Sequence, residues 1–315
     1  MRIEKGLLTT TLAVCAAGLG ACSSGSSTDE SIGYLSLGVS DAPLHDAEKV
    51  CIAFDSVGLY GAAGGPVEID LGGVQNVNLL EFQGANAWPM LFEEPLPAGR
   101  YEQMRLGIIA PRGVSGGVGD NPMSAECVGE ESYITFEDGT FHNLYMPSGA
   151  ESGYKLNGEV IITANQVADF TIEVDLMQSL ATPPGLDPYM VFRPTAKLVN
   201  NLEAGILIGN VAMELATAVD ADSGEACEPA VYVFDDGVEP NAFDPEVEDP
   251  SDSIASAMVK PVANGDATNA YAYSIGFLEA GSYEVAFSCD GESFEPVAGK
   301  AAEIVAGEVT EVDFP

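Results

Sequence analysis

The sequence is poor in basic residues. Only 11 Lys and Arg stand against 49 Asp and Glu, so the formal net charge is −38. A surface of this sign repels phosphate groups, and we expect no nucleic-acid partner. Histidine is also scarce, with 2 residues, so the most common general base is almost absent. Apolar residues are plentiful at 46%, and 315 residues are enough for two domains of ordinary size.

The apolar run near the N-terminus, residues 7–19, is too short to span a membrane as a helix. It follows two basic residues and ends in small ones, which is the layout of a secretory signal peptide. Its end, Leu19-Gly20-Ala21-Cys22, resembles the lipobox of bacterial lipoproteins, whose cysteine is acylated and becomes the first mature residue. The sequence therefore predicts a signal peptide over residues 1–21 and lipidation of Cys22. The alternative is an ordinary signal peptide that ends in a cysteine by chance.

Residues 22–31 are small and polar, and we expect them to form a flexible tether. A lipidated terminus carries several acyl chains, which suffice for stable anchoring, so the membrane is the first expected partner. Ser23 follows the cysteine, where an aspartate would be the familiar signal for retention in the inner membrane. The resemblance therefore implies an outer-membrane lipoprotein of the cell envelope.

Four cysteines remain after the signal peptide: Cys51, Cys127, Cys227 and Cys289. An oxidising compartment permits disulfides, and four cysteines allow three pairings. A domain boundary near residue 200 leaves two cysteines on each side, which favours Cys51–Cys127 and Cys227–Cys289. Each bond would stabilise the fold by roughly 4 kcal/mol in the chain-entropy model. The alternatives are buried thiols or metal ligands, but the C-x-x-C spacing typical of zinc and redox sites is missing.

Residues 32–200 predict a first domain made of short strands. Alternation of apolar and polar residues over 32–40 and 168–176 indicates half-buried strands, and 133–136 with 141–146 predicts a hairpin. Residues 77–82 fit either a strand or one helical turn. Many short strands separated by turn signals favour an all-β fold, an antiparallel β-sandwich.

Several motifs of this region carry a family resemblance. Together they resemble the bacterial and archaeal lipoprotein family known as domain of unknown function 4382, over about residues 33–199. The family is similar to secreted β-sandwich modules and has no established reaction, so the resemblance implies location more than activity. The motifs, in chain order, are Leu37-Gly-Val-Ser-Asp-Ala-Pro43, Leu96-Pro-Ala-Gly-Arg-Tyr101, Arg105-Leu106, Pro147-Ser-Gly-Ala-Glu-Ser-Gly-Tyr-Lys-Leu156, Asp175-Leu176 and Arg193-Pro194.

Residues 204–315 predict a second β-sandwich domain, which ends in a hairpin around Gly307. Leu278-Glu-Ala-Gly-Ser-Tyr283 repeats the pattern of Leu96-Pro-Ala-Gly-Arg-Tyr101. The pattern resembles prealbumin-like and carboxypeptidase-regulatory-like β-sandwich modules, in which a turn delivers a tyrosine to the core. These modules are usually non-catalytic spacers or binding platforms, so we expect the same module type here.

A calcium site is the only cofactor that the sequence suggests. Asp220, Asp222 and Glu225 alternate around a glycine turn, a spacing that suits hard cation ligation. They lack the remaining ligands of an EF-hand loop. An acidic loop over 235–253 adds further carboxylates. The alternative, which we prefer, is a solvated acidic loop and no cofactor.

Catalysis is not expected. Ser115 lies in a G-x-S-x-G pattern, but a nucleophile elbow must lead into a helix, and the following residues 118–122 cannot start one. His45 and His142 are the only histidines, and nothing in the sequence places a nucleophile beside either. A hydrolase is therefore the least favoured function.

Two sets of residues in the first domain are candidates for binding or for structure. Asp41, Arg105, Lys155 and Asp175 fall in the family-like motifs, and we expect a basic one to pair with Asp41 or Asp175 inside the domain. A binding role for the cluster is the alternative. Residues 88–92, which begin with Trp88, form an apolar loop segment that belongs to the core or, if exposed, to a contact patch.

The sequence therefore predicts a non-enzymatic outer-membrane lipoprotein of two β-sandwich domains that binds a protein or a glycan, or acts as a scaffold. A structural accessory subunit of an envelope assembly is the alternative. An apolar patch near Trp88 would favour such docking, and a groove with exposed tyrosines would favour a glycan.

Overall fold

Strands make up most of the chain that the structure describes. The structure is a computed structural model, and residues Ser31–Pro315 form one unit by their contacts. It describes residues 31–42, 47–61, 65–112, 123–147, 153–181, 189–219, 226–238, 240, 253–263, 270–291, 294 and 299–315.

The elements of the first sandwich are β1 (Ile32–Ala42), β2 (Ala47–Tyr60), β3 (Val67–Asn78), the 3₁₀ turn η1 (Leu79–Glu81), β4 (Trp88–Pro97), β5 (Gly99–Ile108), β6 (Tyr133–Phe136), β7 (Phe141–Tyr145), β8 (Tyr154–Ile162), β9 (Val167–Asp175), α2 (Leu176–Ser179), β10 (Leu180–Ala181), β11 (Tyr189–Phe192) and β12 (Thr195–Asn200). Those of the second are β13 (Ala204–Val211), α3 (Met213–Ala216), β14 (Ala230–Asp235), β15 (Ala255–Met258), β16 (Lys260–Pro261), β17 (Tyr271–Glu279), β18 (Gly281–Ser288), β19 (Lys300–Ile304) and β20 (Val309–Glu311).

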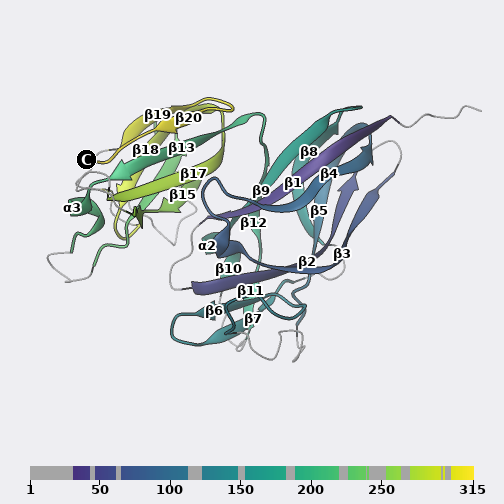
Figure 1. Ribbon diagram of the computed structural model, residues 1–315, viewed down its shortest axis with the longest axis horizontal. Coiled ribbons are helices and arrows are strands. Elements are labelled where there is room, and N and C mark those ends of the chain that lie inside the picture. The colour runs from purple at the N-terminus through teal and green to yellow at the C-terminus, as the bar shows by residue number, and fades with distance from the viewer. Residues whose placement is uncertain are drawn as a thin grey trace, which may run out of the picture. The chain divides into compact units, whose positions relative to one another are not determined.

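Each sandwich is built from one continuous part of the chain, purple to teal for the first and green to yellow for the second in Figure 1. In the first, a sheet ordered β12-β9-β1-β4 faces a sheet ordered β10-β11-β7-β6-β2-β5-β8, with β3 also on β2. In the second, the sheets are β16-β17-β13-β20 and β15-β14-β18-β19. Separate apolar cores fill the two sandwiches. The predicted all-β fold of two sandwiches is confirmed, whereas the division into domains at residues 32–200 and 204–315 stays a prediction.

The sheets are mostly antiparallel, but three strand pairs are parallel. These pairs are β1 with β9, β7 with β11, and β13 with β20. In each sandwich the opening strand runs between an antiparallel and a parallel neighbour. The chain passes through strands of the opposite sheet before it returns to form the parallel neighbour. Short-range sequence patterns do not indicate such a pairing of distant segments.

The two sandwiches share one strand arrangement. Strands β1, β2, β4, β5, β8 and β9 occupy the same places as β13, β14, β17, β18, β19 and β20. Equivalent strands have equivalent partners: β5 lies between β2 and β8, and β18 lies between β14 and β19. The short sequence echo therefore marks corresponding turns of a repeated architecture.

Backbone hydrogen bonds repeat as well. The amide of Tyr34 donates to the Gln166 carbonyl at 2.9 Å, and the amide of Ile206 donates to the Glu308 carbonyl at 3.0 Å. At both places the opening strand passes very close to the turn opposite. A Cβ on Gly205 would lie 2.5 Å from the Val305 carbonyl oxygen, so a side chain does not fit there.

The repeated turn carries a tyrosine that closes a corner between sheets. Tyr101 donates its hydroxyl to the Pro97 carbonyl at 2.8 Å, and Tyr283 donates to the Glu279 carbonyl at 2.8 Å. The turns join β4 to β5 and β17 to β18, which lie in different sheets. Tyr101 is buried in the core, and Tyr283 is half-buried. The hydroxyl thus fixes the chain where it crosses from one sheet to the other.

Two local expectations are corrected, and an open one is resolved. Trp88 begins strand β4 rather than lying in a loop, and β4 is an edge strand, where its prolines are tolerated. Residues 302–314 are not a hydrogen-bonded hairpin, because β19 and β20 lie in different sheets. Residues 77–82 are split between the end of β3 and η1, and Asn78 caps this turn by accepting a bond from the Leu80 amide at 3.4 Å.

Strand β2 is covered on both faces, which explains its continuous burial from Lys49 to Phe54. One face belongs to the core. The other is covered by the segment before β6: Cys51 is bonded to Cys127, and Ser132 accepts a hydrogen bond from the Ala53 amide at 2.9 Å. A strand covered in this way shows no alternation in its sequence.

Candidate functional site

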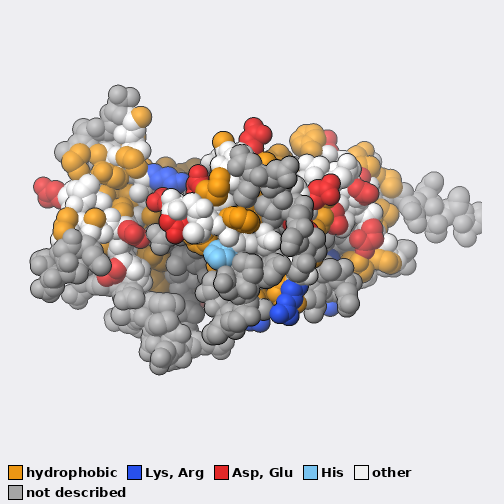
Figure 2. All heavy atoms as spheres, turned by 90° about the horizontal axis from the view of Figure 1, so that it is seen from below, with side chains coloured by type: hydrophobic (Ala, Val, Ile, Leu, Met, Phe, Trp, Pro, Cys, Tyr) orange, Lys and Arg blue, Asp and Glu red, His pale blue; other side chains and the backbone are white. Residues whose placement is uncertain are grey.

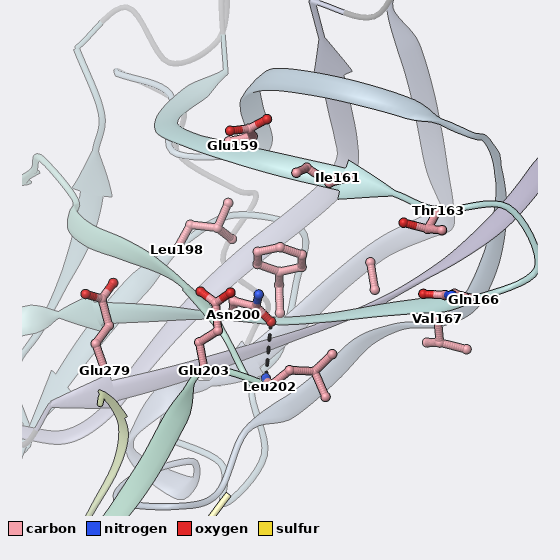
Figure 3. Close-up of a pocket in the computed structure, with 12 residues that line it drawn as sticks. Glu159, Ile161, Thr163, Gln166, Val167, Leu198, Asn200, Leu202, Glu203 and Glu279 are labelled. Atoms are coloured by element: carbon pink, nitrogen blue, oxygen red, sulfur yellow. Dashed lines mark hydrogen bonds between the residues drawn. The ribbon is translucent and has the colours of Figure 1, made fainter. Parts of the chain in front are cut away.

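A groove of about 400 Å³ opens along one side of the first sandwich. Its walls come from β8, β9 and β12, from the turn after β12, and from the end of β17 (Figure 3). Strands β8 and β12 are the terminal strands of their sheets. They approach closely at one end, where a Cβ on Gly158 would lie 3.4 Å from the Leu198 side chain. Beyond that contact the two sheet edges diverge and leave the groove between them.

The groove has an apolar floor and flank. Phe170 and Leu198 come from the core face of the β9 and β12 strands, and Phe170 is almost fully buried. Apolar side chains at the rim reach solvent: Ile161 is 55% exposed, Val167 41% and Leu202 70%. Exposed apolar side chains that line one concavity are a usual mark of a binding surface.

Three carboxylates lie at one end of the groove. In Figure 3, Glu159, Glu203 and Glu279 lie on the side away from Gln166 and Val167. Glu159 forms an ion pair with Arg100. Glu203 and Glu279 are exposed, and among the described residues that line the groove none is basic. The groove therefore offers negative charge at one end and amide and hydroxyl groups at the other.

The turn after β12 is held in place by its own hydrogen bonds. The side-chain oxygen of Asn200 accepts a bond from the Leu202 amide at 3.1 Å, which Figure 3 shows as a dashed line. The carbonyl of Asn200 accepts from the Glu203 amide at 2.9 Å, and the carbonyl of Glu203 accepts from the Ala280 amide at 3.0 Å. These bonds fix the backbone that presents Leu202 and Glu203 to the groove.

Outside the groove, two buried carboxyl groups have strongly raised pKa values. The pKa of Glu173 is raised to about 8, mainly by burial; the Ser40 hydrogen bond and the Lys197 charge oppose this rise, and the Asp175 charge adds to it. Burial, with the like charges of Glu173 and Asp175, raises the pKa of Asp41 well above its ordinary range. Hydrogen bonds from the Gln83 side chain and the Leu176 backbone oppose the rise in the pKa of Asp41 without cancelling it. Oε2 of Glu173 has no hydrogen-bond partner among the described residues. With a pKa of about 8, the Glu173 carboxyl is mostly protonated near neutral pH.

The structure separates the four residues expected to cluster. Asp41 and Asp175 lie on β1 and β9, whereas Arg105 and Lys155 are neighbours on β5 and β8 of the other sheet. Arg105 faces outward, because the residues on either side of it point into the core. Its guanidinium lies 4.1 Å from the centre of the Tyr60 ring, and its Nε donates to Gln103 at 2.9 Å. The expected basic partner of Asp41 is therefore neither Arg105 nor Lys155, and Asp41 has acidic neighbours instead.

A family model described as "Domain of unknown function (DUF4382)" matches residues 32–194, more than half of the chain. The chain belongs to the DUF4382 family. The DUF4382 region contains strands β1 to β11, and hence the β8 and β9 walls of the groove. Strand β12 and the second sandwich lie beyond the match. The family description names no activity, so the groove has to be interpreted from its own residues.

A comparison with curated proteins gives no match for this DUF4382 chain. Solved structures with some likeness include the TIE protein of Bacillus anthracis, at 11% identity and a TM-score of 0.19, over 90% of this chain and 33% of the other. The chain thus spans about a third of that protein. The minor pilin GBS52 of Streptococcus agalactiae has 10% identity and a TM-score of 0.20, over 89% and 94%. A leucine-rich repeat protein of Bacteroides thetaiotaomicron has 12% identity and a TM-score of 0.20, over 90% and 26%. Likeness at this level carries no argument about function.

Both disulfides predicted for this DUF4382 protein are present. Cys51 is bonded to Cys127 and Cys227 to Cys289, with sequence separations of 76 and 62. Each bond stays within one sandwich. The first attaches the segment before β6 to β2, and the second attaches the segment before β14 to the end of β18.

Several expected sites of the DUF4382 chain lie outside the described residues. These are the signal peptide, Cys22 and the tether up to residue 30, His45, Ser115, and the calcium candidates Asp220, Asp222 and Glu225. Within the described ranges, no group of three or more His, Cys, Asp or Glu side chains is arranged to hold a metal ion. In the same ranges, no helix has the length and apolar character needed to cross a membrane.

Two further candidates have structural roles. The His142 ring packs edge-on against Phe136, with centroids 5.9 Å apart. Trp88 is half-buried and stacks on Phe54, with ring centroids 5.9 Å apart, so it belongs to the core rather than to a contact patch. Sequence reasoning missed the groove entirely. The one residue that could have indicated the groove from the sequence is Ile161, an apolar residue between two others that face the core.

Proposed function

We propose that this chain is a non-enzymatic binding module, held at the outer membrane by an acylated Cys22, and that the groove between β8 and β12 is its binding surface. The observation that carries the binding role is the groove: exposed Ile161, Val167 and Leu202 line a concavity whose backbone is fixed. The anchor rests on the lipobox-like sequence and on the polar stretch that follows it.

A binding role fits the groove better than a reaction does. Its described lining residues supply carboxylates, amides and the Thr163 hydroxyl, and none of them is a histidine or a cysteine. The carboxyl groups with strongly raised pKa values, Asp41 and Glu173, are not among the lining residues. Strongly perturbed groups in a cleft are the usual sign of acid–base chemistry, and here the two features are separate.

The anchor is tested by metabolic labelling with a fatty acid in the native host. We expect the label on the natural protein, which should sediment with membranes. The variant Cys22→Ser should lose both the label and the sedimentation. Equal labelling of the two proteins would contradict acylation at this residue.

The binding surface is tested with a photo-reactive side chain placed at Leu202, or at Val309 on β20 as a control of similar exposure, 70% against 58%. In intact cells, we expect Leu202 to give one reproducible cross-linked product that Val309 does not. The captured partner, once purified, should bind the purified protein, and Leu202→Ser should weaken that binding. The same products from both positions, or none from Leu202, would refute a binding role for the groove.

A further inference from the structure

We propose that the groove takes an extended peptide segment of a partner protein, in which apolar side chains alternate with lysine or arginine. This inference rests on the proposed binding function and names the chemistry of the partner. It joins three properties of the groove: free strand edges on its walls, exposed apolar positions along them, and unbalanced negative charge at one end.

The walls suit an extended backbone. Within the described ranges, β8 is hydrogen-bonded only to β5, and β12 only to β9, so each has one edge without a strand partner. From Glu159 to Thr163 the β8 wall spans about 13 Å at a strand rise of about 3.3 Å per residue. A segment of about five extended residues matches this length. Addition of such a segment to a free sheet edge is a common mode of peptide recognition.

The apolar positions suit alternating side chains. Ile161 faces the groove from β8, and Leu198 and Phe170 face it from the opposite sheet. In an extended peptide every second side chain points to the same side, so one set can cover this floor while the other set points outward. Burial of Leu202 and Val167 at the rim would add to the stability of the complex.

The charge selects a basic partner. Glu203 and Glu279 lie near each other at one end, and the lining residues that the structure describes include no cation to balance them. Lys197 lies on the β12 wall itself, but its Nζ donates to the Ile254 carbonyl at 3.1 Å. Incoming lysine or arginine side chains would meet two exposed carboxylates, with the (CH₂) stems on the apolar floor.

Two other occupants fit less well. A second copy of this chain would bring more negative charge, since the chain carries 49 acidic and 11 basic residues. The face drawn in Figure 2 likewise has acidic side chains scattered over it. A glycan usually stacks on exposed aromatic rings, whereas Phe170, the sole aromatic lining residue in the described chain, is 7% exposed.

The probe is a fluorescent hexapeptide of alternating lysine and valine, titrated with the purified protein at 0.15 M salt. Peptides that alternate glutamate with valine, and lysine with serine, test the charge and the apolar floor separately. We expect the lysine–valine peptide to bind at least tenfold more tightly than either. Equal binding of the glutamate–valine peptide would overturn the charge argument, and equal binding of the lysine–serine peptide would overturn the role of the floor.

Matched variants separate the groove from the general negative charge. The double variant Glu203→Gln/Glu279→Gln should bind the lysine–valine peptide at least fivefold more weakly. The double variant Glu308→Gln/Glu311→Gln removes two exposed carboxylates elsewhere and should stay within twofold. Equal weakening by both variants would show non-specific attraction and refute the site. If cross-linking at Leu202 succeeds but the peptide does not bind, the groove binds another partner and only this inference fails. If both fail, the proposed function fails as well.

Discussion

Replacement of Glu173 by glutamine should change how the stability of the protein depends on pH. The pKa of this carboxyl rises from an ordinary 4.5 to about 8 in the folded state, mainly because of burial. Between these two values the folded protein keeps a proton that the unfolded chain releases. The contribution of Glu173 to stability is therefore largest below about pH 4.5, falls as the pH rises toward about 8, and is level above that.

The magnitude follows from proton linkage. One such proton lowers the free energy of unfolding by about 1.4 kcal/mol for each pH unit, or by about 3 kcal/mol between pH 4.5 and pH 7. Glu173→Gln cannot ionise, so this decrease should be missing. Relative to the natural protein, the variant should gain about 3 kcal/mol over that interval, whatever constant cost the amide itself brings. In the variant, the missing Glu173 charge also lowers the pKa of Asp41 toward its ordinary value. The loss of stability with rising pH that Asp41 causes should therefore become smaller as well.

Urea unfolding at pH 5, 6, 7 and 8, with the disulfides kept oxidised, measures this difference. The fluorescence of Trp88, stacked on Phe54, reports the unfolding of the first sandwich. Glu311→Gln, at an exposed position of β20, serves as the control and should run parallel to the natural protein. A constant difference between Glu173→Gln and the natural protein across the four pH values would refute the reasoning, since Glu173 would then ionise as an exposed carboxyl does.

Two further predictions concern the repeated architecture. Gly205→Ala should destabilise the protein by about 1–3 kcal/mol in thermal unfolding, because the added Cβ would lie 2.5 Å from a backbone oxygen. Gly281→Ala is the control and should be close to neutral, because the nearest atom to its added Cβ lies at 3.5 Å. Equal effects of the two substitutions would contradict the close approach at Gly205. Tyr101→Phe should cost about 1 kcal/mol by loss of its bond to the Pro97 carbonyl, and a midpoint of urea unfolding unchanged from the natural protein would show that the corner does not depend on this bond.

The alternating strands could be predicted from the sequence because each has one face on a core and one in solvent. Strand β5 is the clearest case, with Met104, Leu106 and Ile108 buried in alternation with half-buried residues. The disulfide pairs followed from the position of the domain boundary. By contrast, the sequence predicts a loop at Trp88, because prolines are unusual in strands and the edge position of β4 that tolerates them is not visible in the sequence.

The groove could not be predicted because it depends on the separation of two sheet edges. Glu159 and Leu198 are far apart in sequence, and nothing local indicates that β8 and β12 end on the same side of the sandwich. The same holds for the acidic neighbours of Asp41. Their proximity comes from the parallel pairing of β1 with β9, a contact between distant parts of the chain.

Strand β4 closes the opposite side of the first sandwich in a different way. It is the far edge of the sheet that ends at β12, and it carries Pro89, Pro95 and Pro97. These residues supply no amide hydrogen to an incoming strand, so this border is a poor template for aggregation into extended β-structure. Chains brought close together would then be kept from polymerising through this edge, whereas the outer edges of β8 and β12 have no strand partner among the described residues.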